Sequence, residues 1–315
     1  MTEALFEDGR PRPGASGPVR VRVPAKINLH LGVGALRPDR YHELTTVYHA
    51  LAVYDEVSAR RGDQLTLTME GEGAGALPLD DTNLVLRAAR ALSAHTGVPA
   101  QARLHLRKNI PLAAGLAGGS ADAAAALVAC DGLWGTGLNR EELAEVASRV
   151  GSDVPFLVLG GTALGTGRGE AVSPVLARAS SWHWVLALAD GGLSTPEVYR
   201  ELDRLRAGGA ADAPLGAADD LLGALRQRDP AVLAKCLGND LQVAALALRP
   251  ALRDTLDTGG RAGALAGIVC GSGPTCAFLA RDAPHATAVA QELSASGTCR
   301  AAVATFGPVA GARVV

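Results

Sequence analysis

Apolar and polar residues alternate along several short stretches of the chain, and turns containing glycine or proline separate them. Alternation with a period of two is typical of a strand that buries one face. It predicts strands over 19–23, 25–33, 64–69 and 102–107, with an interruption at Pro24. Other apolar runs predict strands over 182–188, on both sides of the glycine turn within 267–279, directly after Asp153, and over 301–306.

Good helix formers lie between these strands, bounded by capping residues. They predict helices over 82–95, 120–129, 139–150, from Thr195 onward, and over 283–296, with two or three more after a small-residue linker at 207–218. Ser120 is the expected N-cap of the alanine-rich helix, with Asp122 in its first turn. Strands with helices packed on one face predict an α+β fold.

A glycine-rich passage over 108–120 joins a predicted strand to a predicted helix. Glycines ahead of a helix leave backbone N–H groups uncovered, and these donors together with the helix dipole suit a phosphate group. A flexible connection of small residues is the alternative interpretation. No Gly-Lys-Ser/Thr follows, and Ala117 stands where a dinucleotide fingerprint beginning at Gly115 needs its second glycine. Both of these familiar phosphate loops are therefore excluded.

Polar residues elsewhere could carry chemistry. The alternation places three polar side chains on one strand face, namely Lys26, Asn28 and His30. Such a face is either solvated or part of a site, and Tyr41-His42 follows nearby in a turn. Asp153 comes just after a helix end, where a carboxylate is either a turn residue or a functional group. Gly271-Ser272-Gly273 is either a second ligand-binding turn or a tight hairpin.

Composition excludes several classes of protein. Hydrophobic residues make up 48% of the 315 residues, yet no apolar run approaches the ~20 residues of a membrane helix. A net charge of −2 and 3% aromatic residues argue against a nucleic-acid-binding surface. Five scattered cysteines indicate neither a disulfide framework nor a zinc site. Residues 1–18 lack the apolar region of a signal peptide, so we expect a disordered tail and a cytoplasmic protein.

Lysine is scarce in this chain. Of 30 basic residues only three are lysines, namely Lys26, Lys108 and Lys235. A lysine kept against such a bias indicates a position that needs a compact ammonium group, although chance is the alternative.

Three motifs stand in order along the chain: Pro24-Ala-Lys-Ile-Asn-Leu29, Pro111-x-x-x-Gly-Leu-x-Gly-Gly-Ser120 and Gly271-Ser-Gly-Pro-Thr275. Together they resemble the motifs of the galactokinase, homoserine kinase, mevalonate kinase and phosphomevalonate kinase (GHMP) superfamily. The resemblance implies a two-domain α+β fold. It places a ribosomal protein S5 domain 2-like N-terminal domain over 19–172 and a ferredoxin-like C-terminal domain over 173–315. ATP and the substrate would bind in the cleft between them.

Further motifs narrow the resemblance. Tyr41-His-Glu-Leu44, Ser152-Asp-Val-Pro-Phe156 and residues 161–170 resemble the branch whose substrate is 4-diphosphocytidyl-2-C-methyl-D-erythritol, in the non-mevalonate isoprenoid pathway. This implies ATP-dependent phosphorylation of the 2-hydroxyl of that substrate. A sister kinase acting on homoserine or a mevalonate derivative is the nearest alternative. A non-catalytic protein that keeps the fold and contacts RNA is the alternative from another class.

The resemblance also assigns roles to residues. Lys26 and Asp153 match the catalytic pair, with Asp153 as the base for the substrate hydroxyl and Lys26 orienting that hydroxyl and stabilising negative charge. The implied ATP-binding residues are Lys108, Pro111, Gly115, Leu116, Gly118, Gly119 and Ser120. The implied substrate-binding residues are Asn28, Tyr41, His42, Tyr48, Tyr199, Gly271, Ser272 and Gly273, with Tyr48 and Tyr199 stacking on the cytosine.

Four residues depart from the family pattern. Tyr48 and Tyr199 stand where the family has phenylalanine, which keeps the stacking face and adds a hydroxyl. Ala117 replaces a common glycine, and Ala121 stands where a serine is frequent. We expect phosphate binding to survive, because backbone donors do not depend on either side chain. The sequence shows no dedicated magnesium carboxylate, so Mg²⁺ is expected to arrive with ATP and to be held by phosphate and water. We expect a monomer or weak homodimer without nucleic-acid or membrane partners.

Overall fold

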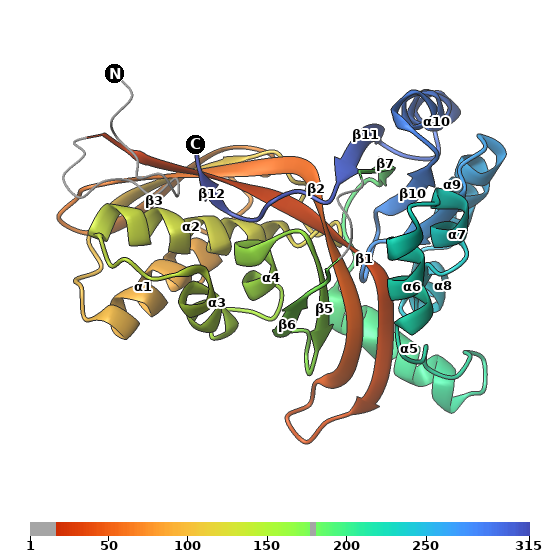
Figure 1. Ribbon diagram of the computed structural model, residues 1–315, viewed down its shortest axis with the longest axis horizontal. Helices are drawn as coiled ribbons and strands as arrows, with labels where there is room; N and C mark the ends of the chain where they lie inside the picture. Colours follow the sequence, from red (N-terminus) through yellow and green to blue (C-terminus); the bar gives the residue numbers. More distant parts are fainter. Residues whose placement is uncertain (1–16, 177–180) are drawn as a thin grey trace.

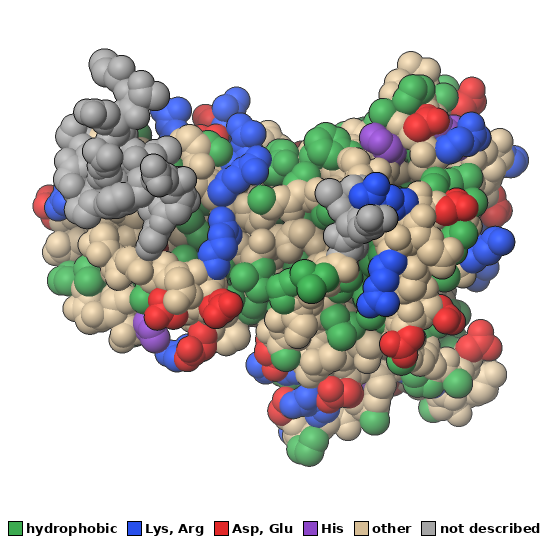
Figure 2. Space-filling model, viewed as in Figure 1, with side chains coloured by type: hydrophobic (Ala, Val, Ile, Leu, Met, Phe, Trp, Pro, Cys, Tyr) green, Lys and Arg blue, Asp and Glu red, His purple; other side chains and the backbone are tan. Residues whose placement is uncertain are grey.

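The computed structural model describes residues 17–176 and 181–315. Residues 1–16, which make up most of the predicted disordered tail, lie outside the described residues. Figure 1 shows two groups of elements side by side, one built mainly from the first half of the chain and the other from the second half. In the same view, Figure 2 shows two lobes with a hollow between them along the upper edge. Each lobe is built around its own sheet.

The first sheet has the strand order β12-β1-β2-β4-β3, while β5 and β8 pair with β2 and β1 and β6 pairs with β5. Its strands are β1 (Val19–Leu36), β2 (His42–Arg60), β3 (Leu65–Gly71), β4 (Ala102–Lys108), β5 (Thr162–Thr166), β6 (Ala171–Pro174), β8 (Gly238–Asn239) and β12 (Arg313–Val314). Helices α1 (Leu84–Thr96), α2 (Gly118–Trp134), α3 (Arg140–Ser148) and α4 (Val154–Leu159) lie on one face of this sheet (Figure 1). The predicted strands over 64–69 and 102–107 are confirmed.

The second sheet is antiparallel, with the order β11-β7-β10-β9. Its strands are β7 (Trp182–Leu188), β9 (Ala266–Val269), β10 (Cys276–Ala280) and β11 (Ala301–Gly307). The accompanying helices are α5 (Thr195–Ala207), α6 (Asp219–Gln227), α7 (Pro230–Ala234), α8 (Gln242–Leu248), α9 (Ala251–Arg261) and α10 (Ala283–Ser296). The strands predicted over 182–188, on both sides of the glycine turn within 267–279, and over 301–306 are confirmed. The helix predicted over 283–296 is confirmed as well. Four helices, α6 to α9, follow the linker, where two or three were predicted.

The long hairpin of β1 and β2 passes through the junction of the two groups (Figure 1). Pro24 does not interrupt β1 as predicted, because it pairs with Tyr54 and the register shifts directly after it. Such a bulge accommodates the missing N–H of proline without ending the strand. From Val23 to Val33 every residue of β1 is buried. Lys26 and Asn28 therefore lie inside the protein and not on a solvated face.

Helix α2 begins at Gly118, two residues before the predicted N-cap Ser120. Its N-cap is Ala117, which has a left-handed φ of 57° and makes no side-chain cap. The prediction assumed that a side chain covers the first N–H groups. Here these N–H groups stay open, and Asp122 lies beyond the first turn, buried within the helix.

Residues 154–159 form helix α4 and not the predicted strand. Periodicity alone does not separate a short apolar strand from a buried helical turn, and Pro155 fits the first turn of a helix. Asp153 occupies the N-cap position without a capping hydrogen bond. Its carboxylate is therefore free for other partners.

Most of the other predicted caps agree with the structure. Asn83 and Asn139 cap α1 and α3 with their side chains, whereas the N-cap of α5 is Ser194 and not the predicted Thr195. In the described parts of the chain, we find no helix with the length and apolar character needed to cross a membrane.

Candidate active site

A cavity of about 530 Å³ lies where the two groups of elements meet. Its walls come from β1, β2, the glycine passage, the residue before α4, the start of α5, and the turn between β9 and β10. The predicted site residues that line it are Lys26, Asn28, Tyr48, Gly115, Gly118, Gly119, Ser120, Asp153, Tyr199, Gly271, Ser272 and Gly273. The other predicted site residues are outside its walls, namely Tyr41, His42, Lys108, Pro111 and Leu116.

Lys26 and Asp153 meet at the wall of this cavity. The ammonium group of Lys26 donates to Asn28 Oδ1 over 2.8 Å and lies 3.5 Å from Asp153 Oδ2. Asn28 Nδ2 donates to Thr46 Oγ1 over 2.7 Å, and Thr46 donates to the carbonyl oxygen of His30 over 2.8 Å. The side chain of Lys26 is 6% exposed and that of Asp153 is 29% exposed. The chain of hydrogen bonds holds a cation beside a carboxylate that the cavity can reach.

Tyr48 is built into the wall beside Asp153. Its ring stacks on Phe156 with centroids 4.8 Å apart, and only 2% of the residue is exposed. Its hydroxyl donates to Asp153 Oδ1 over 2.9 Å, and the carbonyl oxygen of Gly169 lies 3.3 Å away. Burial, followed by the charge of Asp153, raises the pKa of the Tyr48 phenol well above its usual value. With its ring packed in this way, Tyr48 does not offer the stacking face that the resemblance implies.

The glycine passage brings the N-terminus of α2 to the cavity. The first intrahelical bond runs from Ala121 N–H to the carbonyl oxygen of Ala117 over 2.9 Å. The N–H groups of the three preceding residues, 118–120, have no intrahelical partner. Gly115 has a φ of 77°, and a Cβ there would overlap the carbonyl oxygen of Cys270. Only glycine allows the passage to approach the β9–β10 turn this closely.

Lys108 points into the protein and not into the cavity. Its ammonium group donates to Asp55 over 2.6 Å and to Asp122 over 2.8 Å, and the three side chains are almost fully buried. Burial lowers the pKa of Lys108, but the charges of Asp122 and Asp55 outweigh it, so the pKa is above its usual value. A Cβ on Gly118 would lie 3.0 Å from the Lys108 ammonium. The lysine therefore lies beneath the start of α2.

Two predicted ATP-binding residues have other surroundings. Leu116 is fully buried, and its carbonyl oxygen accepts from the N–H of Lys26 over 3.2 Å. Pro111 lines a smaller neighbouring cavity of about 250 Å³. Both side chains therefore shape the passage from outside the main cavity.

The aromatic residues near the start of α5 differ in their exposure. Tyr199 lies on the cavity wall, and the ring of His42 lies behind it with centroids 5.2 Å apart. His42 Nε2 is 2.9 Å from Asp203 Oδ1, which holds the imidazole in place. Tyr41 is 54% exposed and outside the cavity, with the guanidinium carbon of Arg168 4.9 Å from its ring centroid.

Sequence reasoning missed three residues near this cavity. Thr46 supports Asn28, and its position two residues before Tyr48 on β2 could have indicated a shared face. Thr195 was predicted only as a cap, yet its hydroxyl lies 2.9 Å from that of Ser272. The guanidinium group of Arg168 lies over the ring of Tyr41, which is distant in sequence. No local pattern could have indicated this contact.

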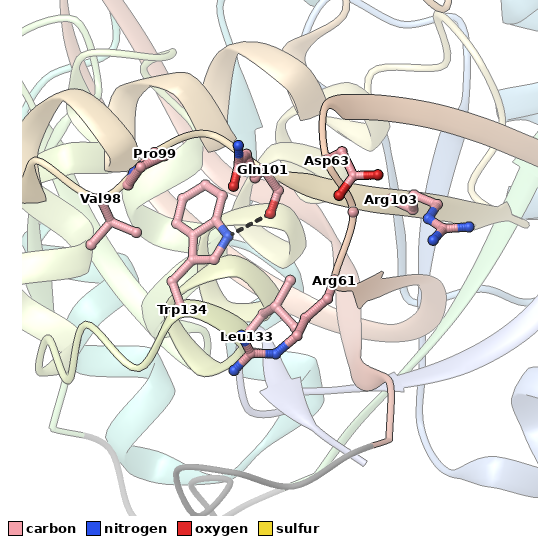
Figure 3. A pocket seen from close by; sticks show the side chains of 9 residues that line it. Arg61, Asp63, Val98, Pro99, Gln101, Arg103, Leu133 and Trp134 are labelled. Carbon is pink, nitrogen blue, oxygen red and sulfur yellow. Dashed lines mark hydrogen bonds between the residues drawn. The ribbon is translucent and has the colours of Figure 1, made fainter.

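A second cavity, of about 480 Å³, lies at the other end of α2 (Figure 3). The indole of Trp134 donates to the carbonyl oxygen of Gln101 over 3.0 Å, and the side chains of Arg61 and Arg103 extend in different directions. Its described lining has one carboxylate, Asp63, and no lysine, histidine or serine. Groups suited to catalysis converge in the first cavity and not in this one.

Comparisons with known proteins identify the family of the chain. A family model described as GHMP kinases N terminal domain matches residues 83–161, and one described as GHMP kinases C terminal matches residues 221–299. The chain is 74% identical over 314 residues to 4-diphosphocytidyl-2-C-methyl-D-erythritol kinase from Salinispora arenicola (strain CNS-205), covering 100% of both. It is 56% identical over 299 residues to the protein of that name from Nocardia farcinica (strain IFM 10152), covering 95% of this chain and 96% of the relative.

Solved structures show the same architecture. A crystal structure of 4-(cytidine 5'-diphospho)-2C-methyl-D-erythritol kinase matches with a TM-score of 0.72 and 32% identity, covering 91% of this chain and 99% of that one. A homoserine kinase from Cytophaga hutchinsonii ATCC 33406 matches with a TM-score of 0.76 and 18% identity, covering 96% and 99%. The second likeness concerns the fold alone. The predicted two-domain α+β fold is confirmed.

Proposed function

The chain belongs to the GHMP kinase family, and on that premise we propose that it phosphorylates the 2-hydroxyl of 4-diphosphocytidyl-2-C-methyl-D-erythritol with ATP. Relatives named for this substrate match the chain along nearly its whole length. This favours the cytidyl substrate over homoserine or a mevalonate derivative. The products are the 2-phosphate of the substrate and ADP.

Asp153 and Lys26 carry the chemical step. The 2-hydroxyl oxygen forms a bond to the γ-phosphorus of ATP, its proton passes to the Asp153 carboxylate, and the bond from the γ-phosphorus to the ADP oxygen breaks. Lys26 orients the hydroxyl and stabilises the negative charge that develops. Because Lys26 Nζ lies 3.5 Å from Asp153 Oδ2, an oxygen bound beside them can contact both groups.

The N-terminus of α2 binds the phosphates of ATP through the open N–H groups of residues 118–120 and the positive end of the helix dipole. Within the described residues, no three His, Cys, Asp or Glu side chains are grouped to hold a metal ion. We therefore expect Mg²⁺ to enter with the nucleotide, bound by phosphate oxygens and water. When bound, it neutralises phosphate charge.

Other residues of the cavity wall bind the cytidyl part of the substrate. Tyr199 provides an aromatic face on the cavity wall, and the imidazole of His42 is fixed behind it by Asp203. The β9–β10 turn, 271–273, lies on the same cavity and contacts the substrate there. Asn28 acts indirectly, because both polar atoms of its side chain already bind protein groups.

The observation that carries this proposal is that Lys26 and Asp153 meet in one cavity with the open N-terminus of α2. The test is ADP formation by the full-length protein with ATP and Mg²⁺. We expect ADP only when 4-diphosphocytidyl-2-C-methyl-D-erythritol is added, and none with homoserine or mevalonate. ADP formation that needs homoserine, or that CDP fails to inhibit, would contradict the proposed substrate.

The role of Asp153 is tested by Asp153→Asn. We expect turnover to fall about 10²- to 10⁴-fold, because the amide cannot accept the proton. The matched control is Asp257→Asn, at an exposed position on α9. It should leave turnover unchanged. Wild-type turnover in Asp153→Asn would remove this carboxylate from the mechanism.

A further inference from the structure

Tyr48 has a buried hydroxyl bound to the proposed base, and neither the chemical step nor the packing of the core requires that hydroxyl. We infer that Tyr48 is a positioning residue that occupies Oδ1 of Asp153 and so leaves Oδ2 as the atom that accepts the substrate proton. The inference rests on the proposed function, in which Asp153 is the base. It replaces the stacking role that the resemblance implied for Tyr48.

The two oxygens of Asp153 have different surroundings. Oδ1 accepts a hydrogen bond from the Tyr48 hydroxyl over 2.9 Å, while Oδ2 lies 3.5 Å from the ammonium group of Lys26. The side chain is 29% exposed, so the cavity can reach it. A carboxylate tied at one oxygen cannot rotate freely, and its second oxygen then points in one direction relative to Lys26. The 2-hydroxyl of the substrate must lie in this direction for Oδ2 to accept its proton.

The wall is shaped to hold a tyrosine here. A Cβ on Gly165 would lie 2.6 Å from Cε2 of the Tyr48 ring, and a Cβ on Gly169 would overlap the Tyr48 hydroxyl. Phe156 stacks on the ring with an interplanar angle of 22°. The two glycines therefore leave room for the phenol, and the stacked aromatic ring fixes its plane.

The hydroxyl acts as a donor. The Tyr48 phenol is buried beside a carboxylate and keeps its proton, and a phenol has one hydrogen to donate. That hydrogen is directed to Asp153 Oδ1, while the longer distance of 3.3 Å to the carbonyl oxygen of Gly169 makes it the weaker acceptor. The hydroxyl therefore serves as a donor to Oδ1 and leaves Oδ2 facing Lys26.

The test is Tyr48→Phe, which removes the hydroxyl and keeps the ring packed on Phe156. We expect kcat to fall about tenfold, since hydrogen bonds to charged groups have roughly this effect, while KM for both substrates changes less than twofold. The melting temperature should stay close to that of the wild type. Tyr54→Phe is the matched control, because Tyr54 lies on the same strand with its ring beside Arg22, outside the cavity.

A double-mutant cycle with Asp153→Asn separates positioning from other roles. If Tyr48 acts through Asp153, then adding Tyr48→Phe to Asp153→Asn should lower single-turnover rates by less than twofold. An equal tenfold loss in both backgrounds would overturn the inference. An unchanged kcat, or a loss confined to KM for the cytidyl substrate, would also overturn it. Absence of any substrate-dependent ADP in the wild type would instead refute the proposed function.

Discussion

Lys26 and Lys108 are two buried lysines beside the same glycine passage, yet they differ in how many hydrogen bonds they donate to carboxylates. Lys108 is 1% exposed and donates to two carboxylates, Asp55 over 2.6 Å and Asp122 over 2.8 Å. Lys26 is 5% exposed and donates to one neutral amide, with the carboxylate of Asp153 at 3.5 Å. The first ammonium group is neutralised inside the fold. The second keeps hydrogen-bonding capacity at a cavity wall.

Burial therefore does not separate a structural lysine from a functional one. An ammonium group can donate three hydrogen bonds. The two lysines differ in how many of these hydrogen bonds protein groups already accept. The resemblance placed both lysines in the site. From their partners we propose instead that Lys108 supports α2 and that Lys26 acts on the ligand. Three changes test this division.

Lys26→Arg should have the largest effect, a fall in kcat of about 10²-fold or more with the fold intact. The wider, planar guanidinium group does not fit the compact position between Asn28 and Asp153. Steady-state kinetics together with thermal unfolding measure both quantities. Lys235→Arg, at an exposed lysine, is the matched control and should change neither. Wild-type kinetics in Lys26→Arg would remove the distinction between the two lysines.

Lys108→Met should act mainly on stability. Removing the cation leaves two buried carboxylates without their partner, so the free energy of unfolding should fall by about 3–5 kcal/mol. Urea unfolding measures this change, and KM for ATP should stay within about threefold. Adding Asp122→Asn should restore part of the stability, because it removes one of the two buried carboxyl groups that lost their partner. A normal stability with a strongly raised KM for ATP would show instead that Lys108 binds the nucleotide.

Asp122→Asn alone should have the smallest effect, on the pH dependence of stability. Burial raises the pKa of the Asp122 carboxyl well above its usual value against the opposing charge of Lys108, and Asp55 adds to the rise. Between the usual and the raised pKa the folded protein binds a proton that the unfolded chain does not. The free energy of unfolding therefore falls as pH rises through this window, by up to about 1.4 kcal/mol per pH unit.

The Asp122→Asn variant should lose this slope, so its free energy of unfolding should vary less with pH above pH 4. Urea unfolding across a pH series measures the slope, and Asp257→Asn should keep the wild-type slope. An unchanged slope in Asp122→Asn would mean that the buried carboxyl does not bind the extra proton.

The positions of several strands along the chain could be predicted because a period of two reports which residues share a face, whereas β2 and β5 were not predicted. The predicted strands over 102–107 and 301–306 agree with β4 and β11 to within one residue at each end. The passage of β1 through Pro24 could not be predicted, because the bulge depends on the partner strand. Nor could α4, since six apolar residues suit a strand and a buried helix equally well.

In the active site, local residue types predicted the glycine passage ahead of a helix, and ordered motifs across the chain indicated Lys26 and Asp153. The partners of these groups could not be predicted. Asp55 is 53 residues from Lys108, and Tyr48 is 105 residues from Asp153. Contacts between such distant segments determine which buried charge is neutralised. They also determine which oxygen of a carboxylate accepts a hydrogen bond from the protein.

The α+β class, the glycine passage ahead of a helix and the family could all be read from the residues alone, because alternation, glycine placement and ordered motifs are properties of the chain read in order. The folded chain was needed to show that Lys108 binds Asp55 and Asp122, that Tyr48 donates to Asp153, and that α2 starts at Gly118 without a side-chain cap. The physical reason is that the charge state and the hydrogen-bond partners of a buried group are set by whatever lies within a few ångströms of it, and those neighbours come from everywhere in the chain.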